Sequence, residues 1–292
     1  MKKMIRWYVV CGMFVLLVFA ASAFADNDPR DYVPLPAGTT LIASYFSHIS
    51  ATNAYSKGNK VANNMDLSAN IGMIRPVYYM KLGPLTVDPQ MIIPFGVQTL
   101  QTNAGAGGEI SSSGLADPIV TATIWFINDP ASKTYLGFTP WFFLPIGEYD
   151  KKKPVNLGGN RFMFREEVGF VKGFGDLNVD LTASVDFFGD NKDFGASGIK
   201  MSQDPIFNFE THVSYDINKT FFTSFDYFFH NGGETKVAGL KQDDKVTTHA
   251  AGVTMGFMLS PSYQLLFKYK QDVSVDSGLK TGTIGTRLAY FF

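Results

Sequence analysis

The amino-acid sequence predicts an all-β fold: a transmembrane antiparallel up-and-down β-barrel of about 12 strands, of the outer-membrane type. Three observations predict it. The chain begins with an export signal, its alternating segments are joined by short and long connections in turn, and its last segment alternates and ends in Phe. The same observations predict the location, which is the outer membrane of a Gram-negative bacterium.

The first 25 residues have the features of a secretory signal peptide. Basic residues at the start are followed by an apolar stretch from residue 7 to residue 20 and by the small-x-small cleavage site Ala23-Phe24-Ala25. The alternative is an uncleaved anchor, but the apolar stretch is short for a helix that crosses a bilayer. We therefore expect a cleaved signal peptide over residues 1–25 and a single barrel domain over residues 26–292.

The composition excludes several classes of protein. The one cysteine, Cys11, lies in the signal, so the exported chain has no thiol for a disulfide, a metal site or a nucleophile. The formal net charge of −1 does not suggest a nucleic-acid partner. Aromatic residues make up 15% of the chain, 28 residues are glycine, and no stretch after the signal has the length of a membrane helix. This leaves a soluble all-β protein or a barrel.

Period-two alternation identifies the strands. Apolar and polar residues alternate across 177–187, 207–217 and 263–269, which gives each segment one apolar and one polar face. Twelve strands are expected near 39–48, 64–80, 85–98, 115–127, 134–146, 161–172, 176–188, 205–217, 220–230, 247–259, 262–272 and 281–292. Pro76, Pro94 and Pro140 fall inside them, where bulges or rim positions would have to hold a residue without an amide proton.

The connections decide between a barrel and a soluble sandwich. Tight connections are expected around residues 83–84, 128–130, 173–175, 218–219 and 260–261. Long polar connections are expected at 50–63, 99–114, 147–160, 189–204, 231–246 and 273–280. A barrel with short periplasmic turns and longer external loops produces this alternation of short and long connections, whereas a Greek-key sandwich does not require it.

The last segment alternates up to the final residue. Ile284, Leu288, Tyr290 and Phe292 share one face. The last strand of a barrel must pair with the first so that no backbone edge meets lipid. This segment looks like the terminal strand that the outer-membrane assembly machinery reads, so that machinery and outer-membrane lipid are expected partners.

If the apolar phase faces lipid, the opposite phase faces the lumen. The residues that this places inside are Asp180, Asp186, Glu210, His212, Asp216, Asp226, Lys268, Lys270 and Arg287. Charges of both signs inside a barrel can pair across the lumen and stiffen it, or they can line a path for a solute. The sequence leaves both roles open for each residue.

The strand near 205–217 also raises the question of an enzyme. His212 and Ser214 stand two residues apart on one face, and a barrel lipid hydrolase uses such a pair. That chemistry needs the pair on the lipid side, but here it shares a phase with Glu210 and Asp216. The histidines show no metal-ligand spacing, and the glycines at 105–108 have no basic residue beside them. We expect no enzyme, no cofactor and no metal.

Several short motifs resemble one family. They are 113–118 (SGLADP), 135–140 (YLGFTP), 143–150 (FLPIGEYD), 160–161 (NR), 212–216 (HVSYD), 232–235 (GGET) and 287–291 (RLAYF). In this order they resemble the outer-membrane family described as meta-pathway phenol-degradation proteins, often labelled transporters. Asp117, Arg161 and Glu234 match recurrent polar positions of that family and are expected at or near the external loops. The resemblance implies a link to the breakdown of aromatic or other hydrophobic compounds.

Three hypotheses for the function follow. The first and preferred one is an outer-membrane channel for passive uptake of small hydrophobic or aromatic solutes. The second is a lipid hydrolase that uses His212 and Ser214. The third is a non-transporting structural or adhesive barrel, which a tightly plugged lumen would favour.

Overall fold

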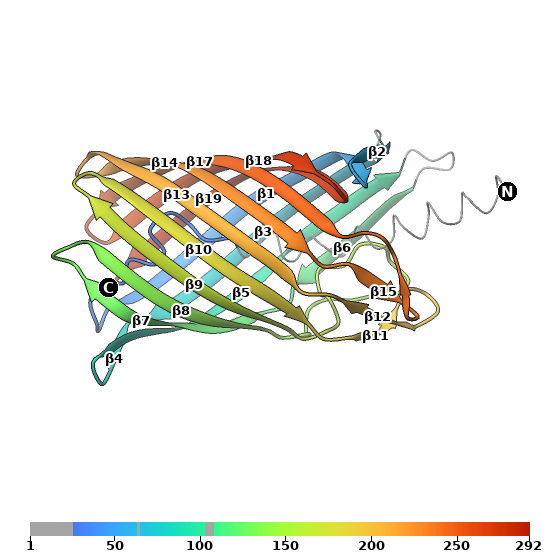
Figure 1. The fold of residues 1–292 in the computed structure, drawn as a ribbon, viewed down its shortest axis with the longest axis horizontal. Coiled ribbons are helices and arrows are strands. Elements are labelled where there is room, and N and C mark those ends of the chain that lie inside the picture. The colour runs from blue at the N-terminus through green and yellow to red at the C-terminus, as the bar shows by residue number, and fades with distance from the viewer. Residues whose placement is uncertain (1–25, 63–64, 103–107) are drawn as a thin grey trace.

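The computed structural model describes residues 26–292 except 63–64 and 103–107, so the expected signal peptide lies outside the described residues. Twelve long strands form an antiparallel barrel, as predicted (Figure 1). They are β1 (Thr40–Ser56), β3 (Met65–Tyr78), β5 (Leu85–Thr102), β7 (Ile119–Asp129), β8 (Thr134–Phe143), β9 (Met163–Phe174), β10 (Leu177–Phe188), β13 (Ile206–Asn218), β14 (Phe221–Gly232), β17 (Val246–Ser260), β18 (Tyr263–Val275) and β19 (Gly278–Phe291).

The last strand closes the barrel on the first. β19 pairs antiparallel with β1 from Leu41↔Phe291 to Tyr55↔Gly278. Thr40 and Phe292 extend this seam by two backbone hydrogen bonds of 2.7 and 3.0 Å. Closure satisfies backbone groups that would otherwise face lipid. No helix among the described residues is long and apolar enough to cross a membrane.

Short strands extend the connections. They are β2 (Asn59–Ala62), β4 (Met80–Leu82), β6 (Glu109–Leu115), β11 (Asn191–Phe194), β12 (Ile199–Gln203), β15 (Thr235–Val237) and β16 (Leu240–Lys241). Strands β11, β12, β15 and β16 form a separate four-stranded sheet, which we call the outer sheet. Figure 1 shows it, with β2 and β6, at the end of the barrel opposite to β4 and the C-terminus.

Several of the expected long connections contain strand residues. β1 continues to Ser56, well into the range 50–63, and only two residues separate the end of β18 at Val275 from the start of β19 at Gly278. Gly278 has a φ of 127°, which glycine adopts easily in a tight turn. Strands that project beyond the bilayer need no apolar face, so period-two alternation does not identify their ends.

The strand expected over 115–127 corresponds to β7, and almost all of β6 lies in the connection expected over 99–114. The Ala116-Asp117-Pro118 segment separates β6 from β7, and β5 pairs with each of them in turn. Among the described residues β6 has no second strand partner. Its other edge receives the backbone amide of Glu148 at the carbonyl of Leu115, at 2.7 Å. A loop between β8 and β9 therefore takes the place of a strand at this part of the wall.

The three prolines within strands lie where pairing is interrupted. The β3–β5 pairing stops at Ile74 and resumes at Val77, on either side of Pro76. The β7–β8 pairing is likewise interrupted opposite Pro140. Pro94 lies between the part of β5 that pairs with β7 and the part that pairs with β6. These positions tolerate a residue that cannot donate to a ladder.

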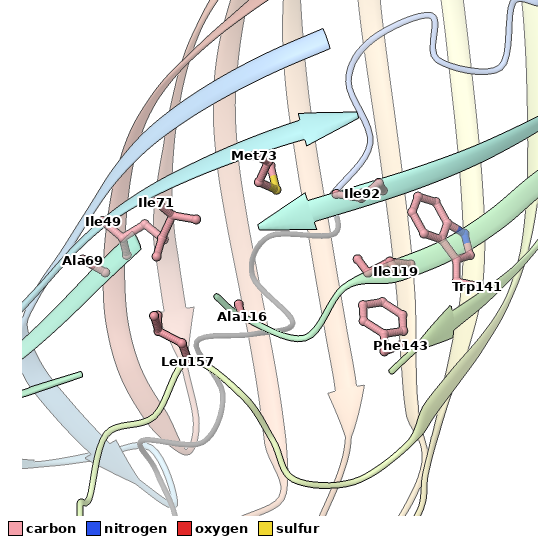
Figure 2. Packing of buried hydrophobic residues seen from close by; sticks show 10 residues of the cluster. All are labelled: Ile49, Ala69, Ile71, Met73, Ile92, Ala116, Ile119, Trp141, Phe143 and Leu157. Atoms are coloured by element: carbon pink, nitrogen blue, oxygen red, sulfur yellow. The ribbon is translucent and has the colours of Figure 1, made fainter. Parts of the chain in front are cut away.

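The two faces of the wall differ as the alternation predicted. Large apolar side chains are exposed on the outer face, for example Phe225 at 59% and Ile284 at 61%. Polar side chains on the opposite phase are buried. The inner face of β1, β3, β5, β7 and β8, with two residues of the connections, Ala116 and Leu157, also carries an apolar cluster (Figure 2). It is formed by Ile49, Ala69, Ile71, Met73, Ile92, Ala116, Ile119, Trp141, Phe143 and Leu157.

Candidate functional site

The chain before β1 lies inside the barrel. We call residues 26–39 the lumen segment; it is the dark blue trace within the strands in Figure 1. The backbone amide of Asn27 donates to Glu210 of β13 at 2.9 Å, and Asp31 accepts from Arg75 of β3 at 3.0 Å. Because β3 and β13 stand far apart in the closed ring, a segment that contacts both must cross the lumen.

Four basic side chains form a ladder on one side of the lumen. They lie on β3, β19 and β18, which stand on either side of β1 in the strand order β3-β1-β19-β18. Each is level with a successive inward-facing residue of β1. Register places Arg75 beside Ala43, Arg287 beside Tyr45, Lys268 on the level of Ser47 and Lys270 on the level of Ile49. We call these four residues the basic ladder.

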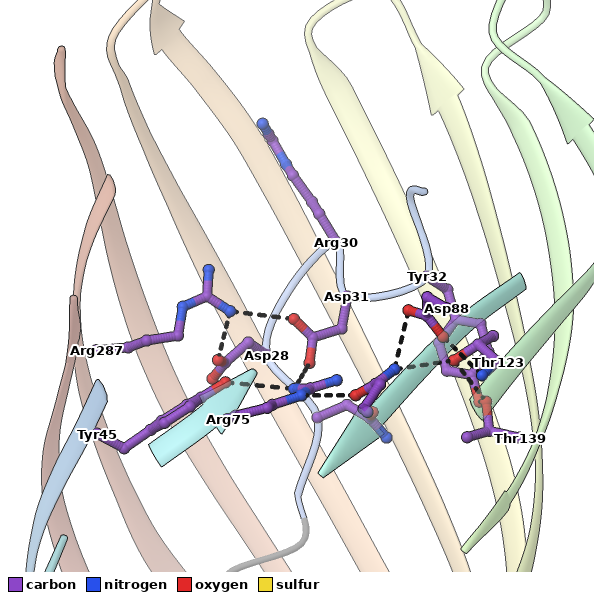
Figure 3. A network of polar contacts seen from close by, with 12 residues as sticks. Asp28, Arg30, Asp31, Tyr32, Tyr45, Arg75, Asp88, Thr123, Thr139 and Arg287 are labelled. Atoms are coloured by element: carbon purple, nitrogen blue, oxygen red, sulfur yellow. Dashed lines mark hydrogen bonds and ion pairs between the residues drawn. The ribbon is translucent and has the colours of Figure 1, made fainter. Parts of the chain in front are cut away.

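Acidic residues of the lumen segment neutralise the basic ladder (Figure 3). Asp31 bridges to Arg75 at 3.0 Å and to Arg287 at 3.1 Å. Asp28 bridges to Arg287 at 2.8 Å and also contacts Lys268, and Asp26 contacts Lys270. The order of the aspartates along the chain matches the order of the cations along the barrel. Each buried cation needs an aspartate beside it, because a buried charge without a partner costs free energy.

The opposite side of the lumen is acidic. Its carboxylates lie on the adjacent strands β9, β10, β13 and β14, and all are less than 5% exposed: Glu167, Asp180, Asp186, Glu210 and Asp226. Arg165 compensates part of this charge through Asp186, with 2.5 Å between Nε and Oδ1. The lumen segment also presents a cation here, since Arg30 bridges to Asp216 at 2.8 Å and its backbone amide donates to Asp180 at 2.5 Å.

An aromatic ring anchors the lumen segment to the wall. Tyr32 packs onto the backbone of Gly137 and Gly169, which are paired neighbours on β8 and β9. A Cβ at Gly169 would lie 2.2 Å from the ring, so only glycine leaves room for it. The hydroxyl of Tyr32 donates to Glu167 at 3.0 Å and lies 2.8 Å from Thr139 Oγ1.

A cavity remains between the lumen segment and the basic ladder. It encloses about 900 Å³ of empty space, part of which is open to solvent. Ile49, Met73, Ile92, Trp141 and Phe228 give it apolar walls, and Arg75, Lys268, Lys270, Asp26 and Asp31 give it charged ones. Trp141 is 4% exposed, and its Nε1 has no hydrogen-bond partner among the described residues. The cavity therefore offers an apolar surface next to cations.

The connection between β8 and β9 enters the barrel from the other end. We call residues 144–162 the inward loop. Its Leu157 packs against Ile49 and Ile71 of β1 and β3, on strands that are not neighbours of β8 or β9 (Figure 2). Val155, fully buried, packs with Ala51 and other residues of the same two strands. The inward loop therefore forms a second constriction above the lumen segment.

Asp117 and Arg161 belong to the attachment of the inward loop. The carboxylate of Asp117 accepts the backbone amides of Gly147 at 2.9 Å and Gly159 at 2.7 Å. Burial raises the pKa of this carboxyl, although the two amides and Arg161 favour its charged form. Burial lowers the pKa of the Arg161 guanidinium to about 10. Arg161 lies 4.5 Å from the ring centre of Phe188 and bonds to Gln203 of the outer sheet.

Glu234, the third position that the family resemblance singled out, lies at the outer sheet and apart from Asp117. Its carboxylate pairs with Lys241 at 2.6 Å, and its carbonyl accepts the amide of Asp204. Gln203, which pairs with Thr235 next to it in the chain, also bonds to Arg161 and so links the two positions. The three residues hold external connections, and a role as an entrance stays a prediction.

All nine polar residues expected in the lumen lie on the inner phase of their strands. Asp180, Asp186, Glu210, His212, Asp226 and Arg287 are buried there, and Asp216, Lys268 and Lys270 are partly buried. Most of them are paired, either with the lumen segment or with each other. Their contact with a solute stays a prediction.

His212 and Ser214 face the lumen, as their phase predicted. Nδ1 of His212 lies 2.8 Å from Asp226, whereas Ser214 accepts from Nε of Arg30 at 3.0 Å. Both side chains are at most 1% exposed, so neither is accessible to a lipid chain. In the part of the chain that the structure describes, no group of three or more His, Cys, Asp or Glu could hold a metal ion.

The sequence patterns do not predict the lumen segment. Its residues belong to the expected barrel domain, but they precede the first expected strand and carry no strand alternation. A signal was present, because Asp26, Asp28 and Asp31 lie close together while unpaired cations were assigned to the lumen from the last two strands. Complementary charge between these two parts of the chain could have suggested the pairing.

Comparison with known proteins places the chain in a family. The family model described as "Putative MetA-pathway of phenol degradation" matches residues 50–288. The COG4313 outer membrane channel from Pseudomonas putida F1 is 30% identical, with a TM-score of 0.87 over 91% of this chain and 100% of that one. No curated protein matches.

More distant solved structures share only the fold. The transport unit of the autotransporter AIDA-I from Escherichia coli is 8% identical, with a TM-score of 0.53 over 95% of this chain and 96% of that one. The β domain of the Bordetella autotransporter BrkA is 10% identical, with a TM-score of 0.51 over 86% and 98%. The chain thus belongs to the family described as "Putative MetA-pathway of phenol degradation", and it is an outer-membrane β-barrel.

Proposed function

We propose that this protein is a passive channel for small hydrophobic or aromatic solutes, and that the lumen segment and the inward loop close it at rest. The cavity beside the basic ladder is the observation that carries this proposal. Its apolar wall, formed by residues such as Trp141, Met73 and Ile92, suits a ring or short alkyl group. A purely polar lumen would offer such a solute no favourable surface.

The lumen segment is held in a way that permits release. Among the described residues its contacts with the wall include ion pairs and hydrogen bonds, which water and solutes can replace, together with the seated ring of Tyr32 and apolar packing of Val33 and Leu35. A channel must bind its solute firmly enough to admit it and weakly enough to release it. Reversible contacts of this kind, distributed over several strands, are compatible with a gate.

Planar-bilayer recordings and proteoliposome swelling with the purified protein test the proposal. We expect infrequent openings in the wild type, because two constrictions lie in series. Weakening both should make conduction frequent and should admit small aromatic solutes. A barrel that passes neither ions nor small aromatics, even after both constrictions are weakened, would contradict a channel function.

The filled lumen favours a second candidate, a non-transporting structural or adhesive barrel. The outer sheet, with the exposed Lys57–Asp243 pair at 2.9 Å beside it, offers a surface built from external connections. The same recordings separate the candidates. A structural barrel stays closed in every variant, and its partner would bind to the outer sheet whether or not the lumen segment is attached.

A further inference from the structure

The lumen segment pairs with the basic ladder through three carboxylates, and this pairing indicates what else the ladder can bind. Each aspartate is a carboxylate on a short stem placed beside an ammonium or guanidinium group. The cavity extends along the same cations, since Arg75, Lys268 and Lys270 line it. A solute in the cavity therefore lies next to groups that already bind carboxylates.

We propose that the basic ladder is the binding path for small aromatic carboxylates, and that Asp26, Asp28 and Asp31 occupy it in place of the solute's carboxylate. This inference rests on the proposed channel function and names the class of solute. The carboxylate of the solute exchanges with an aspartate at one cation after another, while its ring lies on the apolar wall of the cavity.

Charge balance explains why the solute is an anion. When a carboxylate replaces an aspartate, the cation keeps a partner of opposite charge. A neutral ring that displaced the lumen segment would strand four cations, and an unpaired buried charge is strongly destabilising. Arginine adds specificity, because its planar group can hold a carboxylate by two parallel hydrogen bonds.

The apolar wall explains why the carboxylate carries a ring. Trp141 and Met73 face the cavity from the side next to the ladder, so one small molecule can contact both surfaces.

Competition with a tethered aspartate keeps the affinity low. A group held on a short segment has an effective concentration in the millimolar range, so a free carboxylate must compete with it. The expected affinity is weak and saturable, as a passive channel requires. Removal of the three aspartate charges should therefore strengthen binding, and removal of the ladder charges should abolish it.

The test uses benzoate as the probe and benzyl alcohol, a neutral compound with the same ring, as its control. Binding to the detergent-solubilised protein is measured by equilibrium dialysis at constant ionic strength. Displacement of the lumen segment is measured by hydrogen exchange at the amides of Asn27 and Arg30, which donate to Glu210 and Asp180. We expect benzoate, and not benzyl alcohol, to accelerate this exchange in a saturable way.

Four variants decide the result. D26N/D28N/D31N should bind benzoate at least tenfold more tightly, and K268Q/K270Q at least tenfold more weakly. K268R/K270R keeps the charges and should bind as the wild type does, which separates loss of charge from loss of structure. K172Q removes a charge that contacts Ser132 and Thr134 at the short-turn end and should change nothing.

Equal effects of benzoate and benzyl alcohol, or unchanged binding in K268Q/K270Q, would overturn the inference. Such a result would leave the channel proposal intact if the bilayer recordings show conduction. Absence of conduction with clear benzoate binding would instead refute the channel and retain the binding path. The two failures are therefore distinguishable.

Discussion

Tyr32 shows how one residue fixes the position of the lumen segment. Its ring rests on two paired glycines, its hydroxyl bonds to the wall, and its carbonyl accepts from Nε1 of Trp125 at 2.9 Å. Burial of an aromatic ring is worth about 2 kcal/mol, and truncation to alanine costs about 3 kcal/mol or more. The ring is therefore a large part of what holds the segment, together with the ion pairs.

We predict that Y32A releases the lumen segment. A loss of about 3 kcal/mol corresponds to roughly a 100-fold rise in the open population. Hydrogen exchange at the amides of Asn27 and Arg30 should accelerate by that factor, while exchange in the barrel strands stays unchanged. Y32F keeps the ring and loses the hydroxyl bonds, so we expect only about a fivefold change. Equal effects of the two variants would mean that the ring is not the anchor.

At the scale of the element, Asp117 ties the inward loop to the break between β6 and β7. Two backbone amides of the loop, those of Gly147 and Gly159, point to one carboxylate. Tight packing accompanies these bonds, since a Cβ at Gly147 would lie 2.6 Å from the backbone of Asp117. Burial raises the pKa of Asp117, so the folded state holds its proton more firmly than the unfolded chain does.

This shift predicts the pH dependence of stability. A carboxyl whose pKa is raised on folding lowers stability at neutral pH, and the loss is recovered as the pH falls through the raised pKa. Relative to D117N, the wild type should gain free energy of unfolding as the pH falls, and the gain should be complete below the ordinary value of 3.8. Urea unfolding of both proteins over this pH range measures it. A difference that is independent of pH, or of opposite sign, would contradict the raised pKa.

The elements also show which parts of the structure the sequence can predict. Alternation between lipid and lumen is a local pattern, so the twelve strands and the inward phase of residues such as Glu210 follow from it. The lumen segment has no periodicity, and its partners lie up to 259 residues away, as in the bond from Arg287 to Asp28. The connection expected over 147–160 has two isolated aliphatic residues, Val155 and Leu157, among polar ones, so its sequence predicts an external loop and not one that enters the barrel.

At the scale of the whole molecule, charge is separated across the barrel. One side of the lumen carries the basic ladder and the other the acidic residues of β9, β10, β13 and β14, and the lumen segment lies between them with charges of both signs. Asp28 and Asp31 face the basic side, and Arg30 faces the acidic side. The segment therefore stiffens the barrel as well as filling it. It links the two walls, and its charges neutralise the like charges that would otherwise repel one another within each wall.

The two obstructions lie in series, and this arrangement predicts how conduction responds to mutation. L157S places a hydroxyl in the apolar contact that holds the inward loop, which weakens that contact. Y32A releases the lumen segment. Because current through constrictions in series is limited by the narrower one, each single variant should conduct little more than the wild type. The double variant should conduct at least tenfold more, which is far above the sum of the two single effects.

Single-channel recordings measure this non-additivity. L259S is the matched control. Leu259 is 60% exposed on the outer face of β17, so its side chain points away from the inward loop and the lumen segment. Full conduction in L157S alone would show that the lumen segment is no barrier, and full conduction in Y32A alone would show the same for the inward loop. Conduction that appears only in the double variant would establish that residues from both ends of the barrel act together as one gate.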